Sequence, residues 1–218
     1  MRRPVEDAAK RALDLTVATL GLVVTAPGLG LIALLVRSSG PGPVIFRQER
    51  VGRYGRPFRI HKFRTLRIGA PGPLVSASGD GRVTRIGAAL RRTKLDELPQ
   101  LWDVLRGEMS LVGPRPEVPT YAALWTAEQR ETILAVRPGI TDPVSILFVN
   151  EAEELAMAAD PDRHYRTELL PRKAQLYAAY VQTRSLTGDL VILLRTMQTL
   201  AGMSQAFGPT RRSGAMQR

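Results

Sequence analysis

The stretch LDLTVATLGLVVTAPGLGLIALLV, residues 13–36, decides how this chain is built. Asp14 is its only charged residue. As a helix, the stretch would extend about 36 Å, which is enough to cross the roughly 30 Å hydrocarbon core of a bilayer. A secretory signal peptide is disfavoured because the stretch is long for that role and no small-residue cleavage motif ends it before Arg37. Its length also disfavours a buried helix of a soluble domain, so the sequence predicts a membrane anchor.

The course of this anchor through the membrane depends on its flanks and on Pro27. Basic residues prefer the cytoplasmic side of a membrane, and here they lie on both sides of the stretch. Pro27 removes a backbone donor and directs its ring toward the carbonyl of Val23, which predicts a sharp bend. A re-entrant hairpin satisfies both signals, whereas a kinked spanning helix is the alternative because transmembrane helices tolerate proline. The flanking basic residues are Arg2, Arg3, Lys10 and Arg11 before the stretch and Arg37, Arg47, Arg50, Arg53, Arg56 and Arg59 after it.

The overall charge predicts an anionic partner. The chain has 31 basic and 20 acidic residues, giving a net charge of +11, which favours nucleic acid, a lipid surface or a phosphorylated substrate. The absence of cysteine excludes disulfides and thiolate metal sites. Only two histidines, His61 and His164, are present, so a histidine-rich metal centre is not expected.

Downstream of the anchor, the residue patterns predict a small α+β domain that is mostly helical. A Gly- and Pro-rich linker at 38–43 leads into a short β-hairpin, and residues 67–82 have the composition of a loop. Apolar residues at helical spacing predict several helices, among them amphipathic ones suited to a membrane interface. The hairpin strands are expected at 44–50 and 57–66, and the helices at 83–92, from just before Pro99 to Leu105, at 122–136, 172–186 and 189–203.

Asp96 and Glu97 form an acidic pair within a basic neighbourhood, at the expected N-terminus of the helix that follows. Free backbone N–H groups stabilise negative charge there. An aspartate that merely caps the helix is the structural alternative. A carboxylate stabilised in this way can also attack phosphorus to form an acyl phosphate, and an adjacent carboxylate suits Mg²⁺ together with substrate phosphates.

Three basic residues are candidates for binding phosphate. Lys62 and Arg64 are expected on one face of the second strand, and Arg115 is framed by Pro114 and Pro116. Each alone can be a solvated surface charge. Together they can hold a diphosphate, with arginine contributing its bidentate fork and lysine a point charge.

Three motifs resemble the bacterial sugar transferase family, the monotopic polyprenol-phosphate phosphoglycosyl transferases, in their small minimal form. They are KFRT at 62–65, DELPQLWDVLRGEMSLVGPRP at 96–116 and RPGIT at 137–141, and the resemblance extends over about residues 10–203. It implies a re-entrant membrane hairpin at 1–37 with its break at Pro27. It further implies a cytoplasmic catalytic domain at 38–207, and a flexible basic tail is expected at 208–218.

The resemblance also implies a reaction. In the family, the aspartate that corresponds to Asp96 attacks the β-phosphate of a UDP-sugar, releases UMP and forms a covalent phosphosugar intermediate. Polyprenol phosphate then accepts the phosphosugar, in the first membrane step of a bacterial glycoconjugate pathway. The implied roles are catalysis by Asp96 and Glu97, Mg²⁺ binding by Glu97, and substrate binding by Lys62, Arg64, Arg115 and Pro116.

The implied location is the cytoplasmic face of the bacterial inner membrane. The expected partners are the UDP-sugar donor, the polyprenol phosphate acceptor and membrane lipids, with a second copy of the chain compatible with the sequence. A membrane-anchored nucleic-acid binder is one alternative, but only 6% of the residues are aromatic and none is regularly interleaved among basic residues for base stacking. Nucleic acid is therefore not expected as a partner. A non-catalytic scaffold of a glycan assembly complex is the other alternative, and the intact Asp96–Glu97 pair argues against it.

The chain departs from the family pattern in two places. Many relatives continue Gly-Trp-Ala-Gln after the position of Thr141, whereas this chain has DPVSI at 142–146, so the sequence does not assign the sugar. Asp103 stands where many relatives have asparagine. We expect it to be a neutral exchange on the helix surface.

Overall fold

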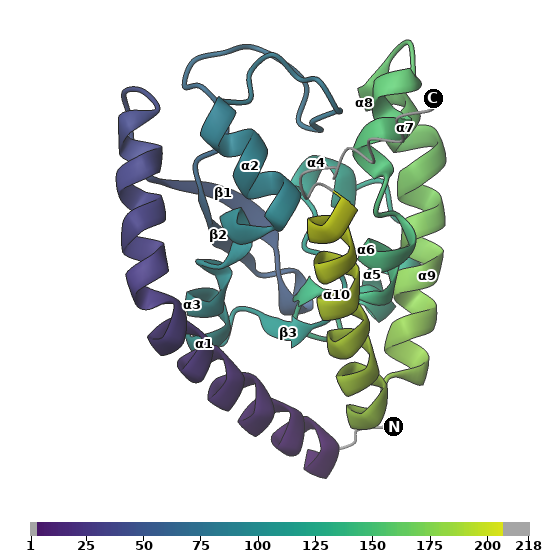
Figure 1. Cartoon of the computed structure of the whole chain (residues 1–218). Coiled ribbons are helices and arrows are strands. Elements are labelled where there is room, and N and C mark those ends of the chain that lie inside the picture. The colour runs from purple at the N-terminus through teal and green to yellow at the C-terminus, as the bar shows by residue number, and fades with distance from the viewer. Residues whose placement is uncertain (1–3, 207–218) are drawn as a thin grey trace, which may run out of the picture.

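The computed structural model describes residues 4–206 and has the mostly helical α+β architecture that the sequence predicts. The long helix α1 forms one flank, α9 and α10 form the other, and two small sheets lie between them (Figure 1). The expected tail at 208–218 lies outside the described residues. The helices are α1 (Pro4–Ser38), α2 (Arg85–Thr93), α3 (Gln100–Leu105), α4 (Pro119–Ala122), α5 (Ala127–Ile133), α6 (Pro143–Leu147), α7 (Glu151–Met157), α8 (Pro161–His164), α9 (Leu170–Thr183) and α10 (Leu186–Ala206). The strands are β1 (Ile45–Val51), β2 (Pro57–Phe63), β3 (Ser110–Val112) and β4 (Gly139–Thr141), and the shorter turns are η1 (Arg53–Gly55), η2 (Leu95–Glu97) and η3 (Tyr165–Leu169).

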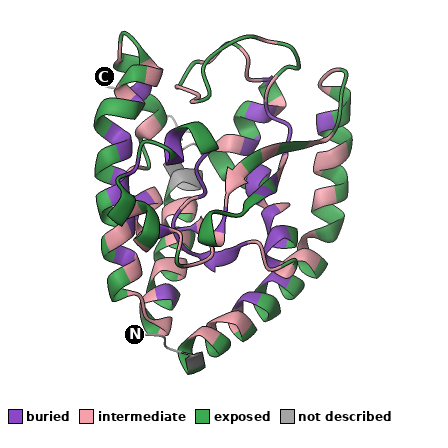
Figure 2. Cartoon of the chain, turned by 180° about the vertical axis from the view of Figure 1, so that it is seen from behind, coloured by how far each residue is buried: buried purple, intermediate pink, exposed green. Residues whose placement is uncertain are grey.

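Helix α1 has the length and composition of a membrane helix. Among the described residues it is the one helix that meets both requirements for crossing a bilayer, and only 6% of its most apolar window is buried inside the protein. Figure 2 shows exposed residues along most of its length, whereas buried residues concentrate in the body of the domain. Because its apolar surface faces outward, α1 is not the core helix of a soluble domain.

The break expected at Pro27 is present only as a bend. Residues 4–38 form one continuous helix that changes direction near its middle, rather than two helices folded back as a hairpin (Figure 1). Two known causes of bending coincide in this region. Pro27 has no N–H to donate to the carbonyl of Val23, and the Thr25 hydroxyl donates to the carbonyl of Gly21 at 2.6 Å. The helix remains continuous because proline costs a single backbone hydrogen bond.

Polar contacts attach the N-terminal half of α1 to the domain. The Asp14 carboxylate is buried and accepts the N–H of Leu111 in β3 at 3.0 Å. Lys10 forms an ion pair of 2.6 Å with Asp189 in α10, and Arg11 donates to the carbonyl of Val104 at 2.8 Å. The single charge within the apolar stretch is therefore a structural anchor between α1 and β3.

Arg64 closes the C-terminal end of α1. Its guanidinium is buried and donates to the carbonyls of Val36 at 2.9 Å, of Gly40 at 2.8 Å and of Pro41. These carbonyls belong to the last turn of α1 and to the linker after it, where the helix itself supplies no donors. Arg64 thus fixes the chain between the membrane helix and β1.

The two sheets differ in how far the sequence predicts them. Strands β1 and β2 pair antiparallel from Ile45↔Phe63 to Val51↔Pro57, which confirms the predicted hairpin. Strands β3 and β4 pair in parallel and have three residues each, too few to give a periodic signal. They approach so closely just beyond β3 that a Cβ added at Gly139 would overlap the backbone of Gly113.

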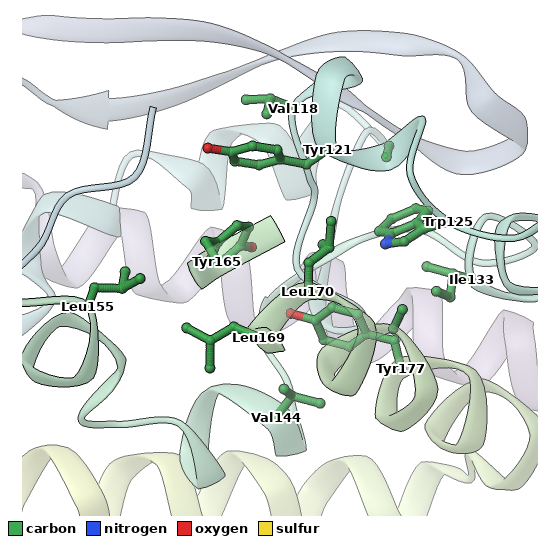
Figure 3. Packing of buried hydrophobic residues seen from close by; sticks show 12 residues of the cluster. Val118, Tyr121, Trp125, Ile133, Val144, Leu155, Tyr165, Leu169, Leu170 and Tyr177 are labelled. Carbon is green, nitrogen blue, oxygen red and sulfur yellow. The ribbon is translucent and has the colours of Figure 1, made fainter. Parts of the chain in front are cut away.

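Three clusters of buried side chains form the core. The largest joins α4, α5, α6, α7 and α9, with Tyr165, Leu170 and Tyr177 enclosed between Tyr121 and Val144 (Figure 3). A second cluster packs α1 against β2, α3 and β3, and a third packs the end of α1 against Phe63 and Leu90. The first half of α1 is therefore part of the second cluster, and its end belongs to the third.

Several predicted helix boundaries are wrong. The helix expected at 122–136 is present only as the shorter α5, because α4 ends at Ala122 and Thr126 starts a new helix through a capping box with Gln129. Residues 143–169 contain three short helices and the π-helical turn η3 that were not predicted. The helices expected at 83–92, 172–186 and 189–203 are confirmed as α2, α9 and α10 with shifted ends.

The role of Arg64 can be tested through stability. Arg64→Ala removes three charge-assisted bonds and leaves carbonyls without donors, so we expect the free energy of unfolding to fall by about 3 kcal/mol. Urea unfolding in detergent micelles, followed by tryptophan fluorescence, measures this change. Arg59→Ala, at an exposed position on β2, is the control and should change stability by no more than about 0.5 kcal/mol. Equal effects of the two substitutions would contradict the capping role.

Candidate active site

Three segments that are distant in sequence meet at Glu97. Lys62 comes from β2, Glu97 from η2 and Arg115 from the loop after β3. The Glu97 Oε1 atom accepts from Lys62 Nζ at 2.7 Å and from Arg115 Nη2 at 2.5 Å, and its Oε2 atom accepts from Arg115 Nη1 at 3.3 Å. The structure therefore brings together three of the predicted site residues in one ion cluster, in which Glu97 is buried and the two cations are partly exposed.

Asp96 lies beside this cluster, in a different local structure from the one predicted. Helix α2 ends at Lys94, whose φ of 57° turns the chain into the 3-10 turn η2. Helix α3 begins only at Gln100, so Asp96 does not cap it. The Asp96 side chain is buried, and among the described residues its Oδ1 atom has no hydrogen-bond partner. A buried acceptor without a hydrogen bond costs about 1–3 kcal/mol, and this oxygen is available to a ligand that enters the site.

The two neighbouring carboxyl groups have opposite pKa shifts. Burial raises the pKa of Asp96, and the negative charge of Glu97 raises it further. Burial would also raise the pKa of Glu97, but the positive charges of Arg115 and Lys62 hold it well below its usual range. Adjacent titratable groups with diverging pKa values are typical of catalytic sites. Glu97 is thus the stably ionised member, and Asp96 is the one whose charge is poorly compensated.

The cations respond to the same environment. Glu97 raises the pKa of Arg115 well above its ordinary value. Burial, together with the nearby Arg115, lowers the pKa of Lys62 to about 8. Arg115 is therefore a permanent cation, whereas Lys62 can lose its charge in mildly alkaline solution.

Arg91 borders this site and was not among the predicted residues. It donates to the Thr65 hydroxyl at 2.9 Å and to the Ser76 hydroxyl at 2.6 Å. Burial lowers the pKa of Arg91, and among the nearby charges that oppose this effect Asp96 has the strongest influence. Ser76 belongs to the loop at 67–82, which arches over the molecule from α2 toward α7 (Figure 1). Arg91 lies on the polar side of an amphipathic helix, so its sequence pattern did not distinguish it from a solvated surface charge.

Two other predicted site residues have different surroundings. Arg64 lies just beyond the end of β2 and binds the carbonyls at the end of α1, so it does not join Lys62 on one face as predicted. Pro116 is buried, and its carbonyl accepts from Arg50 Nη1 at 2.9 Å. Its contact with Arg50 positions the loop that carries Arg115.

The prediction that Asp103 is a neutral surface residue is wrong. Asp103 is fully buried and accepts both the backbone N–H of His61, at 2.9 Å, and its Nδ1 atom, at 2.6 Å. His61 directly precedes Lys62 in β2, so this pair fixes β2 against α3. Asp142, the first residue of the DPVSI segment that departs from the family pattern, is also buried and caps α6 by accepting the N–H of Ser145.

The comparisons with known proteins agree with these motifs. The profile of the bacterial sugar transferase family matches residues 5–203. The chain belongs to the bacterial sugar transferase family. This transferase is 38% identical to a UDP-glucose:undecaprenyl-phosphate glucose-1-phosphate transferase of Caulobacter vibrioides, over 94% of this chain and 74% of the relative. It is 32% identical to a UDP-N-acetylgalactosamine-undecaprenyl-phosphate N-acetylgalactosaminephosphotransferase of Aeromonas hydrophila, over 90% of this chain and 44% of the relative.

A further relative is the UDP-glucose:undecaprenyl-phosphate glucose-1-phosphate transferase of Escherichia coli. It is 46% identical over 140 residues, which cover 61% of this chain and 29% of the relative. This sugar transferase therefore spans about three quarters of the Caulobacter protein but less than half of the other two. The names of these relatives differ in the sugar, so family membership alone does not assign the sugar.

The lowered pKa of Lys62 predicts a pH dependence of stability. Between about pH 8 and 10.5 the unfolded chain retains a proton on Lys62 that the folded chain has released, so this residue makes the free energy of unfolding rise with pH in that window. Urea unfolding at pH 7.5 and pH 10 should show this rise, at most about 3 kcal/mol, as the difference between wild type and Lys62→Met. Lys62→Arg, which stays charged, should also lack it. Parallel profiles for wild type and Lys62→Met would contradict the assigned shift.

Proposed function

We propose that this sugar transferase moves a phosphosugar from a UDP-sugar to polyprenol phosphate, giving polyprenol-diphosphate-sugar and UMP. One observation carries the proposal: a buried carboxylate oxygen, Asp96 Oδ1, has no hydrogen-bond partner among the described residues and lies next to an ion cluster formed by Glu97, Lys62 and Arg115. An unsolvated anion beside cations suits attack on a phosphorylated substrate. The names of the relatives support both the donor class and the acceptor class.

The cations of the site suit the donor diphosphate. Arg115 offers a guanidinium fork and Lys62 a compact ammonium group. Glu97 holds both side chains in place before the substrate arrives, which reduces the entropy lost on binding. Arg91 and Lys94 add positive charge near Asp96. Donor binding would therefore place the β-phosphorus among these cations and beside Asp96.

The chemistry divides into two displacements at the same phosphorus. In the first, an Asp96 carboxylate oxygen forms a bond to the β-phosphorus, the bond from that phosphorus to the bridging oxygen breaks, and UMP leaves with the bridging oxygen. In the second, a phosphate oxygen of the polyprenol carrier attacks the same phosphorus and Asp96 leaves as a carboxylate. Among the described residues Asp96 Oδ1 accepts no hydrogen bond, so no such bond has to break before this oxygen attacks.

The site also suits a divalent cation, although the described residues contain no group of three or more His, Cys, Asp or Glu side chains that would form a complete metal site. Glu97 is adjacent to Asp96 in the chain, and it is the member of the pair whose pKa is held low, so it is ionised. Mg²⁺ is commonly held by one or two carboxylates together with substrate phosphates, so we propose that Glu97 holds it only with the donor present, which leaves Asp96 free for attack. When bound, it would neutralise charge on the diphosphate.

We further propose that α1 enters and leaves the membrane on the cytoplasmic face. Basic residues flank both ends of its apolar stretch, and the bend near the middle of the helix lies between them. The N-terminal half is attached to the domain through Asp14, and the C-terminal end is held by Arg64. Both ends of the helix thus contact the same domain, which disfavours placing them on opposite sides of a bilayer.

The function itself is tested by supplying a panel of UDP-sugars, polyprenol phosphate and Mg²⁺ and measuring UMP. Release of UMP with only one or a few donors would identify the sugar. No release with any donor, when the protein is folded and membrane-embedded, would overturn the proposed reaction and favour a non-catalytic scaffold.

Asp96→Asn tests the covalent intermediate. With the reactive UDP-sugar and no lipid acceptor, intact-protein mass spectrometry of the wild type should show an adduct of one phosphosugar, with at most stoichiometric UMP. The asparagine variant has the same size and should fold normally, but it should form no adduct and lose at least about 10³-fold in turnover because it lacks the nucleophile. Turnover by Asp96→Asn at close to the wild-type rate would favour direct attack of the lipid phosphate on the donor instead.

Removal of divalent metal tests the role of Mg²⁺. We expect excess chelator to abolish turnover, because the diphosphate would otherwise approach Asp96 and Glu97 without sufficient charge compensation. Restoring Mg²⁺ should restore UMP release. Full turnover in the presence of the chelator would show that Lys62 and Arg115 are sufficient.

Single cysteines test the course of α1, since the natural chain has none. Val5→Cys and Ser38→Cys lie near the two ends of the helix at exposed positions. Both should be shielded from an impermeant thiol reagent in intact cells and react once the cells are permeabilised. Labelling of the cysteine at position 5 alone in intact cells would show a spanning helix.

A further inference from the structure

A small cavity lies at the opposite end of α3 from Asp96. Its walls come from the N-terminal half of α1, from β3, from the β1–β2 turn and from the residues before β4. Asp96 precedes the first turn of α3, whereas Arg11 in the cavity wall binds the carbonyls of Val104 and Leu105 at its last turn. The cavity volume is about 50 Å³. Sites for drug-sized ligands are roughly 300–1,000 Å³, so this cavity suits a phosphate-sized group and excludes a nucleotide sugar.

Positive charge predominates in the cavity wall, which has five cationic and two anionic side chains. Two of the cations are neutralised, because Lys10 pairs with Asp189 and Arg184 pairs with Asp7. The other three, Arg11, Arg53 and Arg137, form no ion pair among the residues that the structure describes.

These three arginines are held in place by backbone carbonyls. Arg53 Nε donates to Ala135 at 3.0 Å, Arg137 Nε donates to Gly107 at 2.8 Å, and Arg11 donates to Val104. Within residues 4–206, the terminal Nη atoms of Arg53 and Arg137 have no hydrogen-bond partner. The pKa of Arg137 is lowered by burial and then by the positive charges of Arg11 and Arg53. Like charges oriented toward one cavity, with free donors, indicate an anion that would relieve their repulsion.

The surroundings of the cavity indicate that the anion belongs to a lipid. The same half of α1 that contributes Arg11 also exposes Leu15, Val17 and Leu20. Tyr180 and Arg184 of the cavity also line an apolar groove of about 400 Å³ between α6, α9 and α10. A charged cavity next to exposed apolar surface matches an amphiphile with an anionic head.

We propose that this cavity binds the phosphate of an anionic phospholipid, at a site separate from that of Asp96. Two guanidinium groups with free Nη atoms receive the phosphate oxygens, and the acyl chains lie along apolar surface outside the cavity. The site does not receive the polyprenol phosphate acceptor during transfer, because its phosphate would lie at the wrong end of α3. Binding there would hold α1, β3 and the β1–β2 turn together at the membrane surface.

Ligand-induced stabilisation tests the proposal on the full chain in non-ionic detergent micelles. The probes are dioctanoyl phosphatidylglycerol, dioctanoyl phosphatidylcholine and inorganic phosphate at equal concentrations, and the readout is the thermal unfolding midpoint. The test variant is Arg53→Gln/Arg137→Gln. The control is Arg56→Gln/Arg59→Gln, which removes the same charge from exposed positions outside the cavity.

Phosphatidylglycerol should raise the midpoint of the wild type and of the control more than phosphatidylcholine does. Its affinity for the test variant should fall by about tenfold or more, as expected from the loss of two charge-assisted interactions. If the double variant does not fold, Arg53→Gln alone serves the same purpose. The hydrogen bond that it removes, to the carbonyl of Ala135, is exposed, so its loss should affect folding little.

Three results would overturn the proposal. Equal stabilisation by the two lipids would show no preference for an anionic head. Equal losses in the test and control variants would show a diffuse charge effect. Equal stabilisation by inorganic phosphate would show a site for free phosphate. None of these measurements depends on sugar transfer, so a negative result here would leave the proposed function intact, and the reverse also holds.

Discussion

The ion cluster at Glu97 is the interaction on which the rest of the structure depends. A single carboxylate holds Lys62 from β2 and Arg115 from the loop after β3. Removing one partner from a buried ion pair typically costs 3–5 kcal/mol, because the remaining charge is left without compensation. The hairpin, the 3-10 turn and the parallel strands are therefore joined by the same atoms that create the positive field of the site. Assembly of the tertiary structure therefore also brings the Lys62 and Arg115 cations together at Glu97.

This arrangement explains how Asp96 can remain buried without a partner. The cost of an unsatisfied acceptor is acceptable only where the neighbouring contacts strongly fix the backbone. Here the left-handed conformation of Lys94 directs the chain into the turn, and Glu97, the next residue after Asp96, is fixed by two cations. The backbone on both sides of Asp96 is therefore fixed by its neighbours Lys94 and Glu97.

Local features of the fold were predictable from the sequence, whereas features that depend on long-range contacts were not. Some features can be recognised from residues that are close together in the sequence. They are the apolar length of α1, the alternation and turn residues of the hairpin, and the amphipathic spacing of α2. The parallel pair β3–β4 spans only three residues per strand, so it is specified by packing rather than by periodicity. The same holds for Arg64 and Asp103, whose sequence neighbourhoods suggest a binding cation and a surface acid. Their partners, the end of α1 and His61, are distant in sequence.

The close contact of Gly113 with Gly139 has a consequence for how mutations in this protein should be interpreted. Neither glycine has a side chain that could touch a substrate, and both are buried where the backbones of two strands almost meet. Any larger residue at either position would force the strands apart and shift the Pro-Arg-Pro segment that follows Gly113. A mutational scan would then record lost activity at positions without chemical function, with a profile similar to that of Arg115. A substitution that changes the spacing of these two backbones can therefore reduce activity just as the loss of a catalytic side chain does. Only a measurement of the position of the Arg115 guanidinium would distinguish the two cases.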